Sequence, residues 1–347
     1  MKNLIKKVSC LFIGLLVFST FLQAKDEKPI KLILHHLHSP NAPTHTKFLL
    51  PWAENLKKMS NGRIEVEVFP SMSLGGKPNE LYKQARDGTV DIIWTLAGYT
   101  PGVFPRTEVF ELPTVHKGSS VATSLAIKED FDLIKEDFKD VKPLMVYVHA
   151  GNAIHTVNKP ITSVADLKGL KIRTPSRTGG WLIEELGAEP VGMPLPDLPQ
   201  SLSKNAIDGA FVPFEIFPAF KIQQLTKHSI EGYDGERFGT SVFMLLMNKD
   251  KFNSLPKDLQ EIINKSVDLD MVKKVGQIWM DVEKPGIKMQ KESPDSDVTT
   301  LSADAMKNFD AAGQRVVQRW IKEVDTKGID GQKLVDEARK AINKNSK

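Results

Sequence analysis

The segment ITSVADLKGLKIRTP, residues 161–175, contains the signals of a short helix followed by a buried strand. Ser163 and Asp166 have the spacing of a capping box, and Gly169 ends the short helix. Two aliphatic residues then alternate with two basic ones before a proline. A strand with this pattern buries the aliphatic side chains on one face and directs Arg173 to the other.

Arg173 is therefore the first candidate for a ligand-binding residue. Its guanidinium is charged at any accessible pH, and its planar fork of donors fits a carboxylate through two parallel hydrogen bonds. The alternative is an internal ion pair between Arg173 and an Asp or Glu of the same chain. The local pattern favours neither interpretation, so both remain open at this point.

Residues 1–24 have the organisation of a secretory signal peptide. Three lysines precede an apolar core over residues 8–22, and the sequence LQA precedes Lys25 as a cleavage site. Export to the periplasm is therefore expected. No later stretch approaches the roughly 20 apolar residues of a transmembrane helix, so direct membrane insertion of the mature protein is not expected.

Composition argues against several classes of function. The chain has 47 Lys and Arg against 43 Asp and Glu, and removal of residues 1–24 takes away three of the lysines, which leaves no electrostatic basis for binding nucleic acid. The same cleavage removes Cys10, the only cysteine, and excludes disulfides and thiolate chemistry from the mature protein. No nucleophile elbow, HExxH helix or phosphate-binding glycine run is present. We predict neither a catalytic residue nor a cofactor.

Two successive alternations of strands and helices predict an α/β fold with two similar lobes. The order over residues 30–96 is β-α-β-α-β, and a Pro- and Gly-rich loop over residues 98–113 follows. The alternation then resumes with strands at residues 144–149, at the segment ending in Arg173, near Val191 and at residues 207–212.

The last hundred residues are mostly helical after an apolar strand at residues 239–249. A long helix is expected from near Leu255, and Pro285 should bend or end it. Further helices are expected from Ser302 and over residues 331–343. The predicted division places residues 25–149 and about 239–283 in lobe I, and residues 150–238 and about 284–347 in lobe II.

Four histidines near the first strand, His35, His36, His38 and His45, are the best candidates for a metal site, because imidazoles close in sequence can share a zinc ion. His35 and His36, however, would point to opposite faces of a strand. We favour the interpretation that these histidines line a cleft or are solvated, and we predict no metal.

Glu215 lies in the segment VPFEIF, where a helix starts directly after a strand. Ligands of α/β proteins gather at this edge of the sheet, so Glu215 is a second candidate for the site. The alternative is that its carboxylate only compensates the dipole of the following helix.

Five ordered segments together resemble the DctP-type solute-binding subunits of tripartite ATP-independent periplasmic (TRAP) transporters. They are NGRIEVEVFPSMSLGG, DGTVDIIW, GYTPGVFPRTEVFELP, DLKGLKIRTP and LGAEPVGMPLPDLPQSLSKNAIDGAFVPFE. The resemblance implies a periplasmic-binding-protein-like fold with hinge strands and a long bridging helix, whose lobes close on a ligand. It also implies that Arg173, in the KIR motif, clamps the carboxylate of an organic acid that is then delivered to TRAP membrane permease subunits.

The resemblance also assigns the other residues of the site. Relatives of the sialic-acid type have a second arginine where this chain has Asn152 and His155, and an asparagine where it has Val212, so a small, fairly apolar monocarboxylate is expected rather than a sugar acid. The predicted ligand-binding residues are Arg173, Phe214, Glu215, Trp94, His35, His155, Asn152, Met193 and Val212. A monomer is expected. The alternative function is a periplasmic lyase or hydrolase with Glu215 and His155 as acid and base.

Overall fold

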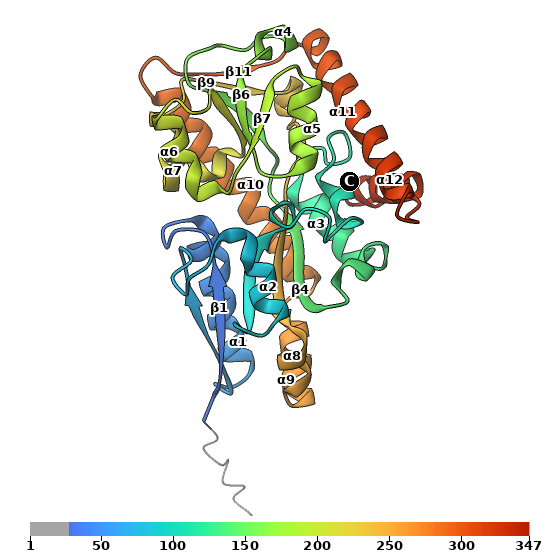
Figure 1. Cartoon of the computed structure of the whole chain (residues 1–347). Helices are drawn as coiled ribbons and strands as arrows, with labels where there is room; N and C mark the ends of the chain where they lie inside the picture. Colours follow the sequence, from blue (N-terminus) through green and yellow to red (C-terminus); the bar gives the residue numbers. More distant parts are fainter. Residues whose placement is uncertain (1–27, 347) are drawn as a thin grey trace, which may run out of the picture.

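The computed structural model describes residues 28–346. The predicted signal peptide, residues 1–24, lies outside the described residues. Within residues 28–346, no helix combines the length and the apolar character that crossing a membrane requires. The described chain forms two lobes, one above the other in Figure 1, each built around its own β-sheet.

The first lobe is built on a sheet of five strands. Its elements are β1 (Ile30–His36), α1 (Leu50–Met59), β2 (Ile64–Phe69), α2 (Leu81–Arg86), β3 (Ile92–Leu96), α3 (Ser120–Glu129), β4 (Val141–Val148) and β10 (Val242–Asn248). The sheet order is β2-β1-β3-β10-β4. β1 is parallel to β2 and β3, with helical crossovers between them, whereas β10 enters antiparallel between β3 and β4. The predicted β-α-β-α-β order is confirmed.

The second lobe is built on a sheet of six strands. Its elements are β5 (Ala153–Thr156), α4 (Val164–Leu167), β6 (Lys171–Thr174), α5 (Arg177–Glu185), β7 (Glu189–Gly192), α6 (Leu198–Ser203), β8 (Gly209–Val212), α7 (Phe217–Phe220), β9 (His228–Glu231) and β11 (Asp297–Thr300). The sheet order is β11-β9-β5-β8-β6-β7. The expected capping box of α4, formed by Ser163 and Asp166, is present, and the strand that carries Arg173 is β6.

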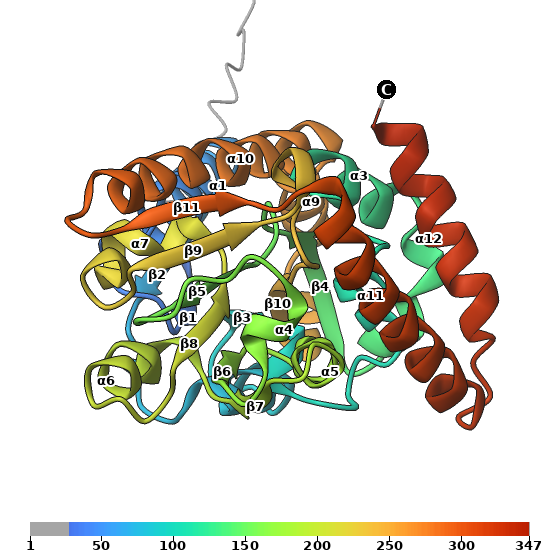
Figure 2. The ribbon, with the colours of Figure 1, turned by 90° about the horizontal axis from the view of Figure 1, so that it is seen from above.

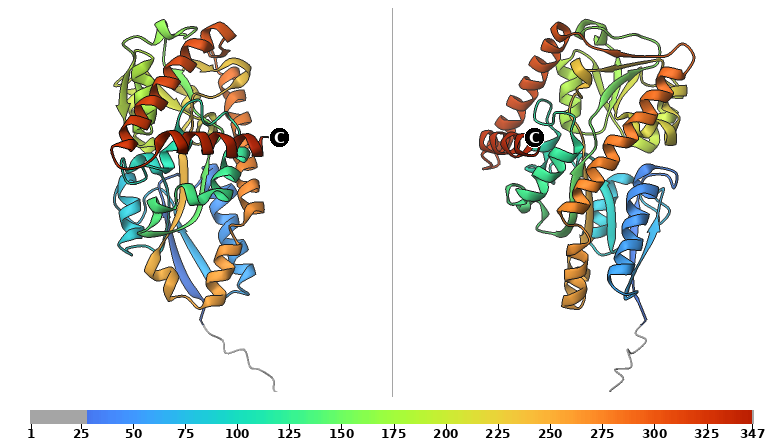
Figure 3. Two further views of the ribbon diagram at one scale, coloured as in Figure 1. Left: turned by 90° about the vertical axis from the view of Figure 1, so that its right-hand side faces the viewer. Right: turned by 180° about the vertical axis from the view of Figure 1, so that it is seen from behind.

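Long helices connect the two lobes. The C-terminal elements are α8 (Lys249–Ser254), α9 (Lys257–Lys265), α10 (Leu269–Glu292), α11 (Ala303–Asp325) and α12 (Gly331–Asn345). Helix α10 runs from one lobe to the other, as seen from behind in Figure 3, and it packs on α3 in the first lobe and on α7 and β11 in the second. Figure 2 shows α11 and α12 side by side at the edge of the molecule, where α11 contacts α5 and α12 contacts α3.

The prediction of a single long helix from near Leu255 is wrong, and Pro285, which was expected to bend or end that helix, does not end it. The segment forms two helices, α9 and α10, and Asp268 caps the second of them. Pro285 lies inside α10, which continues to Glu292. Because Pro285 is exposed, the carbonyl that loses its helical partner can bind water. The buried neighbour Gly286 packs directly on the backbone of Phe214 and holds this part of the helix in place.

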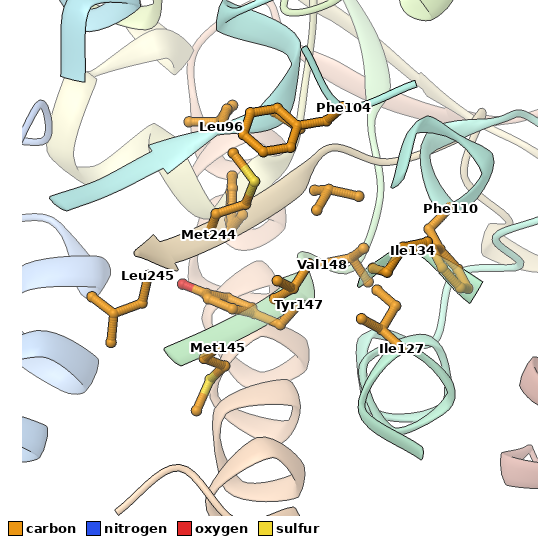
Figure 4. Packing of buried hydrophobic residues seen from close by; sticks show 14 of the residues in the cluster. Leu96, Phe104, Phe110, Ile127, Ile134, Met145, Tyr147, Val148, Met244 and Leu245 are labelled. Atoms are coloured by element: carbon orange, nitrogen blue, oxygen red, sulfur yellow. The ribbon is translucent and has the colours of Figure 1, made fainter. Parts of the chain in front are cut away.

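Tightly packed aromatic and aliphatic side chains fill the interior of the first lobe. Figure 4 shows part of this core, with Tyr147 between residues of β4 and β10. The Trp94 indole donates a hydrogen bond of 2.8 Å to the Tyr147 hydroxyl, and the ring of Phe243 packs on both side chains. A buried polar pair that is satisfied internally leaves little freedom to the surrounding side chains.

Candidate functional site

A small cavity lies between the two lobes, at the ends of strands from both sheets. Its volume is about 20 Å³, which is about the space that admits one water molecule. The lobes are therefore closed, and an organic ligand requires them to separate. The lining residues are His38, Leu96, Tyr99, His149, Asn152, Arg173, Pro175, Leu195, Val212, Pro213, Glu215, Ile216, Ser241 and Phe243.

Arg173 is almost completely buried, with 2% of its surface exposed. Its Nε donates to the carbonyl of Met193 at 2.9 Å, and its Nη1 and Nη2 make longer contacts of 3.4 Å with the carbonyl of Phe211 and the hydroxyl of Tyr99. Among residues 28–346, no carboxylate lies within 4.0 Å of the guanidinium. An internal ion pair, the alternative left open by the sequence, is therefore not formed. Burial lowers the pKa of Arg173, but its ordinary value is so high that the group stays charged.

Tyr99 connects the two lobes at the cavity. It follows β3 of the first sheet, and its hydroxyl oxygen accepts hydrogen bonds from the backbone N–H of Leu195 at 2.9 Å and from Arg173. Burial raises the pKa of Tyr99, so the phenol remains protonated and its O–H is available as a donor. A carboxylate held by Arg173 would lie within reach of this hydroxyl.

Glu215 contributes a buried carboxyl group to the cavity. Burial raises its pKa well above the usual range of a carboxyl, and the neighbouring Glu283 raises it further. Glu283 accepts a hydrogen bond of 2.9 Å from the backbone N–H of Glu215 and is also paired with Arg237 at 3.4 Å. Arg237 also pairs with Glu231 at 2.8 Å. Its positive charge is therefore shared between Glu231 and Glu283, and it forms no ion pair with Glu215. Burial and the Glu283 charge thus both favour the protonated form of the Glu215 carboxyl, whereas the nearby Trp279 indole N–H acts in the opposite direction.

Asn152 precedes β5 where the chain passes between the lobes. Its backbone N–H donates to the carbonyl of Gly239 at 2.8 Å, and its carbonyl accepts from Phe238 at 3.0 Å. Its backbone position is thus fixed against the chain segment that leads into β10, while its side chain lines the cavity.

The two cavity histidines are neutral. Burial lowers the pKa of His38 to about 3, and its Nδ1 contacts the hydroxyl of Thr44 at 2.8 Å. Burial also lowers the pKa of His149 well below its usual range, with His116 and Arg237 adding to the effect. Neither ring supplies a positive charge to the cavity at neutral pH.

Several residues that were predicted for the site lie outside the cavity lining. Trp94 is part of the core, and His35 contacts Gln84 at 2.7 Å. His155 is held between Ser229 and the carbonyl of Val212, and Phe214 packs on the His155 ring. Met193 contributes its carbonyl to Arg173 and lines an outer groove of about 910 Å³ that shares Tyr99 and Pro175 with the cavity.

The histidine cluster does not form a metal site. Nε2 of His36 and Nδ1 of His45 lie 2.9 Å apart, which is hydrogen-bond distance. No group of three or more His, Cys, Asp or Glu side chains in the described part of the chain is arranged to hold a metal ion.

The buried carboxyl of Glu111 joins the two lobes beside the cavity. Its Oε1 accepts from the backbone N–H of Val242 at 2.9 Å, and its Oε2 accepts from the hydroxyl of Thr178 at 3.3 Å. Burial raises its pKa from 4.5 to about 7, although the hydrogen bond from Val242 acts in the opposite direction. The folded state therefore binds this proton more tightly than the unfolded state.

This difference predicts that Glu111 lowers stability as pH rises. The contribution of Glu111 to the free energy of unfolding does not change with pH below pH 4.5, where both states bind the proton. It decreases between pH 4.5 and about 7, because the unfolded state releases the proton first, and it is constant above that range. The variant Glu111→Gln mimics the protonated group. The free energy of unfolding of this variant, measured relative to the wild type, should be higher at pH 8 than at pH 5 by on the order of 2 kcal/mol. Urea denaturation at both pH values measures this gain, and equal effects of the substitution at both would contradict the assignment.

Comparison with known proteins places this geometry in a family. The sequence model of the bacterial extracellular solute-binding proteins, family 7 (DctP), matches residues 34–323. The chain belongs to this family. The predicted resemblance to TRAP solute-binding subunits and the predicted two-lobed α/β fold are thereby confirmed.

Solved structures of family 7 solute-binding proteins superpose on nearly the whole described chain. A TRAP solute-binding protein from a marine metagenome, described as specific for aromatic acid ligands and solved with 3-hydroxybenzoate, is 42% identical, with a TM-score of 0.89 over 92% of this chain and 100% of that one. A TRAP solute-binding protein from Rhodoferax ferrireducens, with copurified benzoate, is 38% identical, with a TM-score of 0.88 over 91% of this chain and 98% of that one.

A curated relative supports the same class. The C4-dicarboxylate-binding periplasmic protein DctP of Rhodobacter capsulatus is 26% identical over 246 residues, which are 69% of this chain and 71% of that protein. Family 7 proteins are extracytoplasmic receptors for small organic acids and not enzymes. The alternative of an enzyme that uses Glu215 and His155 is therefore set aside.

Proposed function

We propose that this protein is a periplasmic receptor that binds an aromatic monocarboxylate through Arg173 and delivers it to TRAP membrane permease subunits. The observation that carries the proposal is the buried guanidinium of Arg173, which has no carboxylate partner among the described residues. Asp197 acts on this guanidinium only from beyond contact distance. Burying a charge without a contacting countercharge is costly, so such a group is suited to an anion that arrives from outside. The fork of the guanidinium matches a carboxylate.

The rest of the cavity supports an aromatic ligand. Half of its lining residues are apolar, and Phe243 among them offers a ring for edge or face contacts. The apolar lining residues are Leu96, Pro175, Leu195, Val212, Pro213, Ile216 and Phe243. A sugar acid would bring several hydroxyl groups into this cavity, more than its few unpaired polar side chains can bind, and each hydroxyl left without a partner carries a cost. The benzoate and 3-hydroxybenzoate found in the two similar structures agree with this preference.

Ligand entry requires the lobes to open. We propose that the described parts of residues 25–149 and about 239–283 move as lobe I against those of residues 150–238 and about 284–347 as lobe II. The crossing segments at Asn152 and Gly239, which are joined by a hydrogen bond, together with α10, would act as the hinge. Helix α12 contacts α3 of the first lobe and so adds a C-terminal connection across the joint. Closure then excludes water and strengthens the contact with Arg173.

A panel of acids tests the proposed ligand class. Isothermal titration of the mature protein with benzoate, mandelate, succinate and glucuronate should show the tightest binding for an aromatic monocarboxylate. Tighter binding of glucuronate or succinate would contradict the proposed class. We expect the receptor to act as a monomer, which light scattering with and without the best ligand measures directly.

A further inference from the structure

Two side chains of the cavity have polar atoms without a hydrogen-bond partner. Both side-chain atoms of Asn152, Nδ2 and Oδ1, are buried and unpaired among the described residues. Oε2 of Glu215 is buried as well and makes no hydrogen bond of good geometry, although the Trp279 indole N–H lies near this carboxyl. Asn152 is 1% exposed and Glu215 is 3% exposed, and both line the same cavity as Arg173. Because a buried polar atom without a partner is costly and rare, these three atoms point to a polar group of the ligand.

The position of these atoms separates them from the carboxylate anchor. In the sheet, β8 lies between β6, which carries Arg173, and β5, which Asn152 precedes. At a spacing of ~4.8 Å, the axes of β5 and β6 are roughly 10 Å apart. Glu215 lies three residues beyond the end of β8. A small acid held at one end by Arg173 would therefore present a different end to Asn152 and Glu215.

The chemistry of the two side chains selects the kind of group. The Asn152 amide offers both a donor and an acceptor, and a protonated Glu215 offers the same combination. A neutral hydroxyl, which donates one hydrogen bond and accepts others, satisfies both. A second carboxylate would bring only acceptors and a charge, and of the residues that line the cavity Arg173 alone is cationic at neutral pH.

We propose that Asn152 and Glu215 form a hydroxyl-binding subsite, so that the receptor selects hydroxylated aromatic monocarboxylates over the unsubstituted acids. This inference rests on the proposed function, in which Arg173 holds the carboxylate. Arg173 then supplies most of the affinity, while Asn152 and Glu215 determine which ring substituent is accepted. The unsubstituted acid leaves the buried amide unpaired, and this penalty is the source of the selectivity.

Matched ligand pairs test the subsite. Isothermal titration compares benzoate with 2-, 3- and 4-hydroxybenzoate, which differ from benzoate by one hydroxyl. At least one isomer should bind about tenfold or more tightly than benzoate, a difference of about 1.4 kcal/mol. Isophthalate, in which a second carboxylate replaces the hydroxyl of 3-hydroxybenzoate, should bind more weakly than the preferred isomer. Equal affinity for benzoate and all three isomers, or a preference for isophthalate, would overturn the subsite.

Variants identify the residues responsible. Asn152→Leu and Glu215→Leu should each reduce the preference for the best isomer over benzoate to within about threefold, whatever each substitution does to benzoate affinity itself. Glu215→Gln keeps a donor and an acceptor and should keep the preference. Loss of both ligands in parallel in the leucine variants would show a structural role instead. If these variants fail to fold, the comparison of benzoate with its hydroxylated isomers on the wild-type protein tests the subsite by itself.

The two proposals fail in different ways. A wild-type protein that binds benzoate and its hydroxylated isomers equally refutes the subsite and leaves the receptor for aromatic acids intact. A protein that binds none of these acids refutes both. Thermal unfolding of each variant without ligand separates an effect on binding from an effect on folding.

Discussion

Replacement of Arg173 by alanine should weaken binding of the preferred aromatic acid by about 2–5 kcal/mol, which is a loss of roughly thirty- to five-thousand-fold in affinity. The reason is that the guanidinium is the only cation among the residues that line the cavity, and the ligand carboxylate would lose its countercharge in a site that the closed lobes shield from bulk solvent. The carbonyl of Met193, which accepts from Nε, would lose its donor as well. Isothermal titration measures the change.

The substitution Arg173→Lys separates charge from geometry. Lysine keeps the positive charge, but its ammonium lacks the planar fork, so we expect affinity to remain well below that of the wild type. Arg319→Ala is a matched control, because Arg319 lines the outer groove and its side chain is about half exposed. Wild-type affinity in both Arg173 variants would remove this residue from the site and with it the proposed anchor.

Strong local patterns made most of the fold predictable. Alternation along β2 and continuous apolar runs in β3 and β10 are signals that tertiary contacts only reinforce. The strands β5, β9 and β11 have four residues each and were not predicted, because their pairing depends on partners far away in the sequence. Helix α10 continues through Pro285 because this residue lies on an exposed face of the helix. Which face of the helix is exposed depends on tertiary packing and could not be predicted from the local sequence.

The cavity was predictable only in part. Of the residues predicted to bind the ligand, Arg173, Asn152, Val212 and Glu215 line the cavity. Phe214, between two lining residues, instead packs on His155, because its backbone directs the ring into the second core. Lining residues from loops carry no periodic signal, since their direction depends on the turns that hold them. Ser241 and His149 are examples that the sequence did not indicate.

Closure of the lobes depends on a close approach at Gly98. This residue follows β3 in the first lobe, and a Cβ atom added to it would lie 2.5 Å from Cβ of Ser176 and 2.9 Å from the carbonyl oxygen of Pro175. Both neighbours belong to the turn between β6 and α5 of the second lobe. Such distances are too short for non-bonded carbon and oxygen atoms, so any side chain at position 98 would hold the lobes apart.

The variant Gly98→Ala should therefore bind ligand at least about tenfold more weakly, although residue 98 is not in the cavity lining. Its effect comes from a lower population of the closed state, since apparent affinity falls in proportion to the fraction of molecules competent to close. Stability without ligand should change little if the open form has room for the methyl group. Titration measures the affinity, and small-angle X-ray scattering should show less compaction on adding ligand than in the wild type.

Gly192→Ala is the matched control for this prediction. Gly192 lines the same outer groove as Gly98, yet no atom lies within 4 Å of a Cβ added there. The control variant should close and bind like the wild type, because its methyl group projects into open space. If Gly98→Ala also bound with wild-type affinity, the contact between Gly98 and Ser176 would not limit closure. The lobes would then have to reach their liganded arrangement without this close approach.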